Sequence, residues 1–121
     1  MFISSVKKFL ALTAAAGVAA ALAIPSDAAT RARTIKLGNN YFVRKGSPPT
    51  VTVKRGQKVV FYWSTSRKHN VFQAGGPIDG KHFHINDQRT GKRVTHIFHT
   101  KGTYPLVCTY HNEMKMTLVV K

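Results

Sequence analysis

The chain has 121 residues and a formal net charge of +15, with 19 lysines and arginines against four acidic residues. This length leaves room for one domain and excludes a second folded core. The single cysteine excludes an internal disulfide, and the dense positive charge points to anionic partners without indicating a fold.

Residues 1–28 have the pattern of a secretory signal peptide. Lys7 and Lys8 provide the positive start, and an apolar, alanine-rich run follows over 9–24. A Ser-Asp-Ala motif with small residues at both ends closes at Ala28, after which we expect cleavage. An uncleaved membrane anchor is the alternative, but this run is short of the roughly 20 strongly apolar residues that span a bilayer. We therefore expect export to a periplasm or to the cell exterior.

The charge of the exported part bears on its partners. Removal of 1–28 leaves 17 basic residues against three acidic ones, a net charge of +14. Such a surface attracts acidic proteins, anionic membrane surfaces and nucleic acid. Export counts against nucleic acid, so we expect none as a partner. The three acids, at positions 79, 87 and 113, are too scattered to form a catalytic carboxylate pair, which argues against an enzyme.

After a short basic tether over 29–33, a single domain is predicted over 34–121. Short β-prone runs alternate there with turns rich in Gly, Pro and Asn, and no long apolar 3.6-residue period is present. This pattern predicts an all-β antiparallel sandwich of about seven or eight strands, with 74–92 as an irregular excursion between the sheets. The predicted strands are 34–37, 41–43, 51–53, 59–63, 70–73, 94–100, 103–108 and 116–120. Trp63 and the Phe or Tyr residues at 61, 62, 72, 98 and 104 are expected in the core.

The segment from Cys108 to Met114 gathers side chains that bind metals. It places a thiolate, the His111 imidazole and a thioether within seven residues, directly after a β-run. Sulfur and imidazole are donors that copper prefers, and two His, one Cys and a weak axial Met are typical of electron-transfer copper. His69 is the strongest candidate for the second imidazole, because it opens a β-run about forty residues before Cys108. The alternatives for Cys108 are an inert buried thiol and an intermolecular disulfide.

Four further histidines allow two interpretations. His82 and His84 have the i, i+2 spacing that shares one face of a strand, and His96 and His99 lie on the next β-run. They could form an auxiliary metal site or simply face solvent. We favour solvent, because no Cys or carboxylate accompanies them at a recognised ligand spacing.

Taken together, these motifs resemble the cupredoxin family, in particular its plastocyanin, pseudoazurin and amicyanin members, over essentially all of 34–121. The matching pieces are Asn40-Tyr41-Phe42, the strand–turn–strand over 51–59, His69-Asn70-Val71, Gly102-Thr103-Tyr104 and the ligand loop over 108–114. The resemblance implies a cupredoxin-like Greek-key β-sandwich with one copper ion, cycling between Cu(I) and Cu(II), on His69, Cys108, His111 and a methionine. It also implies that Asn70 ties the His69 strand to the backbone beside Cys108.

Two methionines compete for the axial position. The spacing from Cys108 through His111 to Met114 resembles the short amicyanin loop, whereas Met116 keeps the longer His-to-Met spacing of plastocyanin and pseudoazurin. In similar family members about seven residues follow the axial methionine, and seven follow Met114 but only five follow Met116. We therefore favour Met114 and expect Met116 to pack beneath the site. Tyr110 departs from the family, because many relatives carry Pro there.

The resemblance implies a monomeric one-electron carrier between redox partners, with acidic proteins expected as partners because of the charge. In relatives the histidine of the ligand loop reaches the surface, so His111 is the expected exit for the electron. An exported copper storage or delivery protein is one alternative. A copper-free, cupredoxin-like module that binds the cell envelope is the other.

Overall fold

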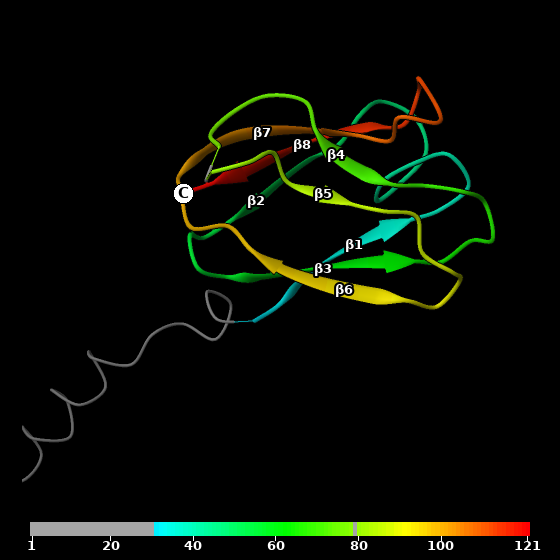
Figure 1. The fold of residues 1–121 in the computed structure, drawn as a ribbon, viewed down its shortest axis with the longest axis horizontal. Helices are drawn as coiled ribbons and strands as arrows, with labels where there is room; N and C mark the ends of the chain where they lie inside the picture. Colours follow the sequence, from blue (N-terminus) through cyan, green and yellow to red (C-terminus); the bar gives the residue numbers. More distant parts are fainter. Residues whose placement is uncertain (1–30, 79) are drawn as a thin grey trace, which may run out of the picture.

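A computed structural model describes residues 31–121 apart from residue 79. The predicted signal segment 1–28, its cleavage point after Ala28 and the first two residues of the tether lie outside the described residues. The described chain folds into two packed β-sheets with eight strands in all (Figure 1), which confirms the predicted β-sandwich. It contains no helix that is long and apolar enough to cross a membrane.

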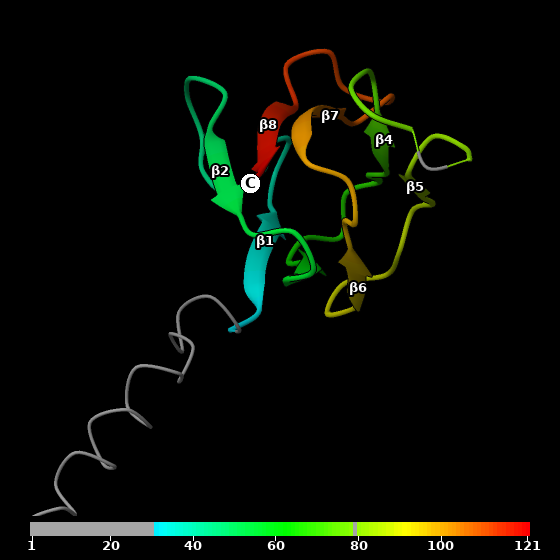
Figure 2. The ribbon, with the colours of Figure 1, turned by 90° about the vertical axis from the view of Figure 1, so that its left-hand side faces the viewer.

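The eight strands divide unequally between the two sheets. They are β1 (Arg33–Leu37), β2 (Thr50–Val53), β3 (Lys58–Trp63), β4 (Val71–Gln73), β5 (His84–Ile85), β6 (Arg93–Ile97), β7 (Gly102–Val107) and β8 (Lys115–Val120). One sheet has the order β1-β3-β6, and the other has the order β2-β8-β7-β4-β5. Seen from one end, the five-stranded sheet arches over the three-stranded one (Figure 2).

Most neighbouring strands are antiparallel, as predicted, but β1 pairs with β3 and β2 pairs with β8 in parallel. The chain leaves β1 for the other sheet, forms β2 there and then returns as β3. A crossover of this kind is what joins parallel neighbours, whereas a tight hairpin joins antiparallel ones. Because β1 begins at Arg33, which pairs with Val59, the last residue of the predicted tether belongs to the sheet.

Alternation of apolar and polar residues fixes which face of each strand is buried. Along β3, β7 and β8 every second side chain points inward, as the period of two in a strand requires. The core includes Trp63, Phe61, Phe98 and Tyr104, in agreement with the predicted aromatic core. Two of the expected core rings, at 62 and 72, are only partly buried, because they lie on the outer faces of β3 and β4.

The predicted strand over 41–43 is wrong. The structure has only an isolated bridge there, between Leu37 and Phe42, within a run of bends. Asn40 and Val43 both have positive φ angles, 65° and 67°, which are incompatible with an extended strand. β5, in turn, was missed within 74–92, because two residues carry too little pattern to reveal a strand.

Four loops meet at one end of the sandwich, at the right in Figure 1. β1 and β3 end there, β4 begins beside the end of β7, and β6 begins beside the end of β3. The loops are 38–49, 64–70, 86–92 and 108–114. Residues far apart in the sequence are therefore brought together at this end of the molecule.

Candidate metal centre

Three potential metal ligands converge where these loops meet. The ligand atoms of His69, Cys108 and His111 all lie within 4.8 Å of one another. Cys108 Sγ is 3.9 Å from His69 Nδ1 and 3.6 Å from His111 Nδ1. Among residues 31–78 and 80–121 this is the one group of three His, Cys, Asp or Glu side chains close enough to hold a metal ion. The structure thus brings together the three residues that the sequence singled out.

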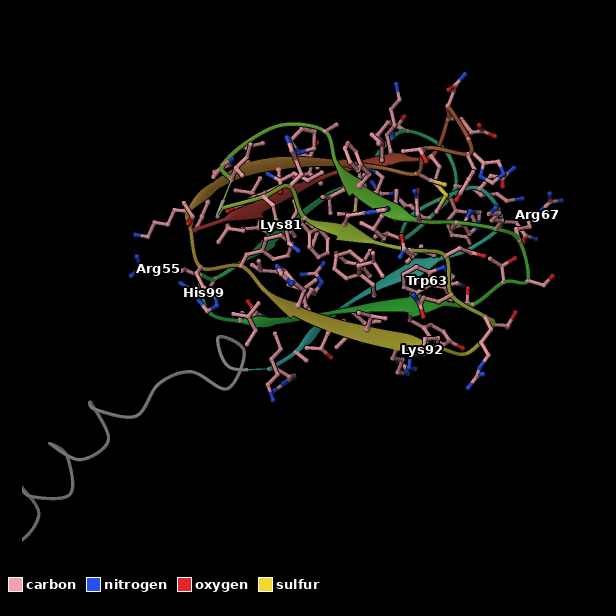
Figure 3. The ribbon with its side chains drawn as sticks, in the orientation of Figure 1. Arg55, Trp63, Arg67, Lys81, Lys92 and His99 are labelled. Carbon is pink, nitrogen blue, oxygen red and sulfur yellow. The ribbon has the colours of Figure 1, made fainter. Side chains whose placement is uncertain are left out.

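His69 is fixed by residues from several parts of the chain. Its side chain is completely buried, and its carbonyl oxygen accepts a hydrogen bond of 3.1 Å from the indole Nε1 of Trp63. Its backbone N–H donates to Asp87 Oδ1 at 2.8 Å. Trp63 lies inside the sandwich, toward the end of the molecule at which Arg67 is found (Figure 3). Sequence reasoning missed both partners, because neither contact follows from local spacing.

A backbone carbonyl orients the His69 ring. Nε2 lies 2.7 Å from the carbonyl oxygen of Gly38, and because that oxygen can only accept, Nε2 must carry the proton. In the neutral ring, Nδ1 then keeps its lone pair and faces the sulfur of Cys108. Burial lowers the pKa of His69, while the hydrogen bond to Gly38 opposes that effect. Protonation of the ring is therefore disfavoured, which favours the neutral form that binds metal.

The β7–β8 hairpin presents the other two candidate ligands. Cys108 directly follows β7, and its N–H donates to the carbonyl oxygen of Met114 at 3.0 Å. Met114 N–H donates in turn to the carbonyl oxygen of His111 at 3.0 Å. The loop is thus a tight turn closed by its own backbone, which holds His111 beside Cys108. Cys108 is buried, whereas His111 is half-buried.

The register of β7 and β8 distinguishes the two methionines that are candidates for the axial position. In β7–β8, Leu106 lies opposite Met116 and Val107 opposite Lys115, so continuing the register places Met114 opposite Cys108. Side chains directly opposite on antiparallel strands share a face, with Cβ atoms about 4.5–5.5 Å apart. Met116 lies two residues deeper, roughly 6.6 Å further along the strand. Both methionines are buried, and the register places Met114, not Met116, at the position opposite Cys108.

Asn70 joins the two halves of the site. Its Oδ1 accepts a hydrogen bond of 2.9 Å from the backbone N–H of Thr109, and its Nδ2 donates to Thr109 Oγ1 at 2.9 Å. It therefore links the residue after His69 to the residue after Cys108. This is the position that the family resemblance implied for Asn70.

The four remaining histidines are not part of this ligand group, although Nε2 of His84 lies 3.5 Å from Nδ2 of Asn70. His82 and His84 are exposed and pack against the ring of Phe72 on the outer face of β4, and His99 is also exposed. His96 departs from the expectation that it faces solvent. It is half-buried against Phe83 and Phe98, with ring centroids 4.3 and 4.6 Å away, because it shares the inward face of β6 with Val94.

The donor set fits copper. Two imidazole nitrogens and one thiolate sulfur, with a thioether on the same face, form the combination that copper prefers over harder metals such as magnesium or calcium. The carboxylate of Asp87 contacts the backbone of His69 and does not belong to the ligand group. Nothing in the residues around Cys108 conflicts with binding of this metal.

Comparison with solved structures supports the fold. A reduced Cu(I) form of an amicyanin mutant at pH 4 matches with a TM-score of 0.64 and 21% identity, over 84% of this chain and 89% of the amicyanin chain. A Cu(I) form of another amicyanin mutant matches with a TM-score of 0.65 and 21% identity, over 78% and 87%. A copper-containing nitrite reductase from Thermus scotoductus SA-01 matches with a TM-score of 0.63 and 19% identity, over 75% of this chain but only 22% of the reductase.

The two sequence comparisons give different results. No curated protein sequence matches this chain significantly. The family model for copper binding proteins of the plastocyanin/azurin family, however, matches residues 35–121 and thus nearly the whole described domain. With the amicyanin-like fold and the His-Cys-His group, this match establishes copper as the cofactor. The chain belongs to the plastocyanin/azurin family of copper-binding proteins, the cupredoxins.

Proposed function

We propose that this protein is an exported one-electron carrier whose single copper ion is held by His69, Cys108 and His111, with Met114 as the weak axial ligand. The observation that carries the proposal is the convergence of Nδ1, Sγ and Nδ1 within 4.8 Å in a largely buried setting. Met114 is chosen over Met116 because it lies opposite Cys108 in the strand register.

The way these ligands are held favours electron transfer. Bound copper supplies the redox chemistry by alternating between Cu(I) and Cu(II), and the protein supplies binding, orientation and a dry surrounding. His69 is held through its N–H, its carbonyl and its ring, and the ligand loop is closed by its own backbone. Ligands that cannot move far keep nearly the same geometry in both oxidation states. A protein that delivers copper would instead need an open site with easily exchanged ligands.

His111 is the proposed exit for the electron. It is less buried than His69 and Cys108, and it follows Tyr110, whose side chain is 48% exposed. The rings of His111 and His69 meet edge to face, with centroids 5.1 Å apart, so the half-buried ring lies directly beside the buried one. A partner that docks on this end of the molecule would therefore approach the copper most closely through His111.

Charge and sequence context suggest where the protein works and with what. The signal-like segment 1–28 supports export to a periplasm or the cell surface. The net charge of +14 that remains favours acidic redox proteins as partners and permits contact with anionic membrane surfaces, whereas nucleic acid is not proposed. We propose a monomeric carrier without enzymatic activity. The match to a nitrite reductase does not support an enzymatic function for this protein, because it covers only 22% of the reductase chain.

A visible absorption spectrum tests the proposal. The Cu(II)-loaded protein should show an intense thiolate-to-copper band, and Cys108→Ser should abolish it, since serine cannot provide a thiolate. The band should bleach on reduction and return on oxidation over many cycles. A wild-type protein that binds Cu(II) but stays colourless would contradict the proposal. A coloured protein that releases copper on reduction would favour storage or delivery.

A further inference from the structure

The loop over 86–92 crosses from one sheet to the other at the metal-binding end of the molecule. It leaves β5 in the five-stranded sheet and enters β6 in the three-stranded sheet. From the sequence it is part of an irregular excursion without an assigned role. In the structure it lies against the segment that leads to His69, and its contacts with that segment are specific.

Backbone and side-chain hydrogen bonds anchor this loop beside β3. Gly91 N–H donates to the carbonyl oxygen of Trp63 at 2.7 Å, and Trp63 N–H donates to that of Lys92 at 2.9 Å. Thr90 Oγ1 donates to the carbonyl oxygen of Thr65 at 2.9 Å. Residues 90–92 are thus fixed to the end of β3 and to the turn after it. The preceding part of the loop, residues 86–89, is therefore held at a defined distance from His69.

Asp87, in the first part of this loop, forms a hydrogen bond with the candidate ligand His69. Its Oδ1 accepts the hydrogen bond from His69 N–H at 2.8 Å, although the two residues are 18 positions apart. A bond from a backbone amide to an ionised carboxylate is about twice as strong as one between neutral groups. The same residue is bound at its carbonyl by Trp63 and at its ring by Gly38. The contact with Asp87 therefore fixes the remaining polar group of the His69 backbone.

We propose that Asp87 is a positioning residue of the copper centre, which the loop 86–92 holds against the backbone of His69 so that Nδ1 points at the sulfur of Cys108. Asp87 does not touch the metal ligands' donor atoms and acts through the His69 peptide. The claim that Asp87 positions a copper ligand rests on the proposed function. The claim that Asp87 fixes the His69 backbone does not.

The chain offers a matched control for the charge of Asp87. Within residues 31–78 and 80–121 the carboxylates are Asp87 and Glu113, and both lie on loops at the metal-binding end. Glu113 is on the ligand loop, and its carboxylate lies 3.5 Å from the side-chain amide of Asn40, not at the His69 backbone. Glu113→Gln thus removes the same charge at the same end of the molecule without disturbing the contact with His69.

Amide hydrogen exchange of His69 in the copper-free protein tests the contact directly. In Asp87→Ala, exchange at His69 N–H should accelerate roughly tenfold to a hundredfold, because a bond to a charged acceptor is lost. Asp87→Asn keeps an oxygen acceptor without the charge, so it should show an acceleration of only a few-fold, and Glu113→Gln should match the wild type. Unchanged exchange in Asp87→Ala would overturn the proposal. If that variant does not fold, equal exchange in Asp87→Asn and Glu113→Gln would overturn it.

The copper-loaded protein separates positioning from charge. Loss of either carboxylate should raise the reduction potential, because a nearby negative charge favours Cu(II) over Cu(I). Asp87→Ala should in addition alter the electron paramagnetic resonance spectrum of Cu(II), and Asp87→Asn should restore most of the wild-type spectrum. Identical spectra and equal potential shifts in Asp87→Ala and Glu113→Gln would show that only charge matters. A wild type without the thiolate-to-copper band would refute the proposed function while leaving the exchange result standing.

Discussion

The two histidines of the copper centre are held in different ways. His69 is buried and is fixed at its N–H, its carbonyl and its ring by Asp87, Trp63 and Gly38, from three separate segments. His111 is half-buried and lies on a short loop that is closed mainly by its own backbone. The scaffold therefore fixes one half of the site, while the other half is a local turn at the surface. We expect changes in the first half to affect stability most, and changes in the second half to affect the reduction potential and partner contact most.

The largest effect is expected in the fixed half, from Trp63→Phe. This change removes the indole donor to the His69 carbonyl and part of a completely buried ring. A buried acceptor without its partner and a new cavity together cost about 2–4 kcal/mol. Denaturant unfolding of the copper-free protein measures this loss. Phe61→Leu, in the same strand and core but without a bond to His69, is the control, and only Trp63→Phe should also change the Cu(II) spectrum.

A second effect is expected in the ligand loop, from Met114→Leu. Loss of a weak axial donor disfavours Cu(II), so the reduction potential should rise while the thiolate-to-copper band remains. The swap conserves volume and should cost less than about 1.5 kcal/mol in stability. Met116→Leu is the matched control, because Met116 is also buried but lies opposite Leu106. A rise in potential with Met116→Leu but not with Met114→Leu, measured by voltammetry, would reassign the axial ligand.

The same division explains what could be predicted from the sequence. Cys108, His111 and Met114 are close in the chain, so their spacing indicates the local half of the site, and alternation along β3, β7 and β8 indicates the sandwich. The contacts that fix His69 join residues that lie 6 to 31 positions from it, and no local pattern reveals them. The failed strand over 41–43 has a similar cause. Its apolar residues suggest β-structure, but Asn40 and Val43 have positive φ angles because the chain turns here toward β2.

A third prediction concerns docking at the metal-binding end. Arg67 and Arg55 lie at opposite ends of the molecule (Figure 3). If the positive charge near the copper steers an acidic partner, changing Arg67, Lys68 and Lys115 to Gln should slow the low-salt bimolecular electron-transfer rate by about tenfold. The same change at Lys54, Arg55 and Lys58 should have much less effect. The difference should fade above about 0.1 M salt, where the Debye length is about 10 Å. Stopped-flow kinetics measure both rates, and equal losses would mean that net charge matters without a basic docking site.

The smallest effect is expected from a contact that joins the two halves at the surface. Lys68, which precedes His69, places its Nζ 4.6 Å from the ring centroid of Tyr110, which precedes His111. Many relatives have Pro at the position of Tyr110, so we expect the contact with Lys68 to provide part of the backbone rigidity that Pro would supply. An exposed cation–π pair contributes about 0.5–1 kcal/mol. A double-mutant cycle with Lys68→Gln and Tyr110→Leu should recover a coupling of that size in denaturant unfolding.

The control for this cycle is the pair formed by Arg93 and Tyr62, whose guanidinium carbon lies 4.1 Å from the ring centroid. It has similar geometry but joins β6 to β3, and neither residue adjoins a candidate ligand. Both cycles should give similar coupling energies. Tyr110→Leu, which changes no charge, should also shift the reduction potential, whereas Tyr62→Leu should not, because only the Lys68–Tyr110 pair constrains the residues beside both imidazoles. A potential that is unchanged in both Lys68→Gln and Tyr110→Leu would mean that the closed backbone of the 108–114 loop suffices to hold His111.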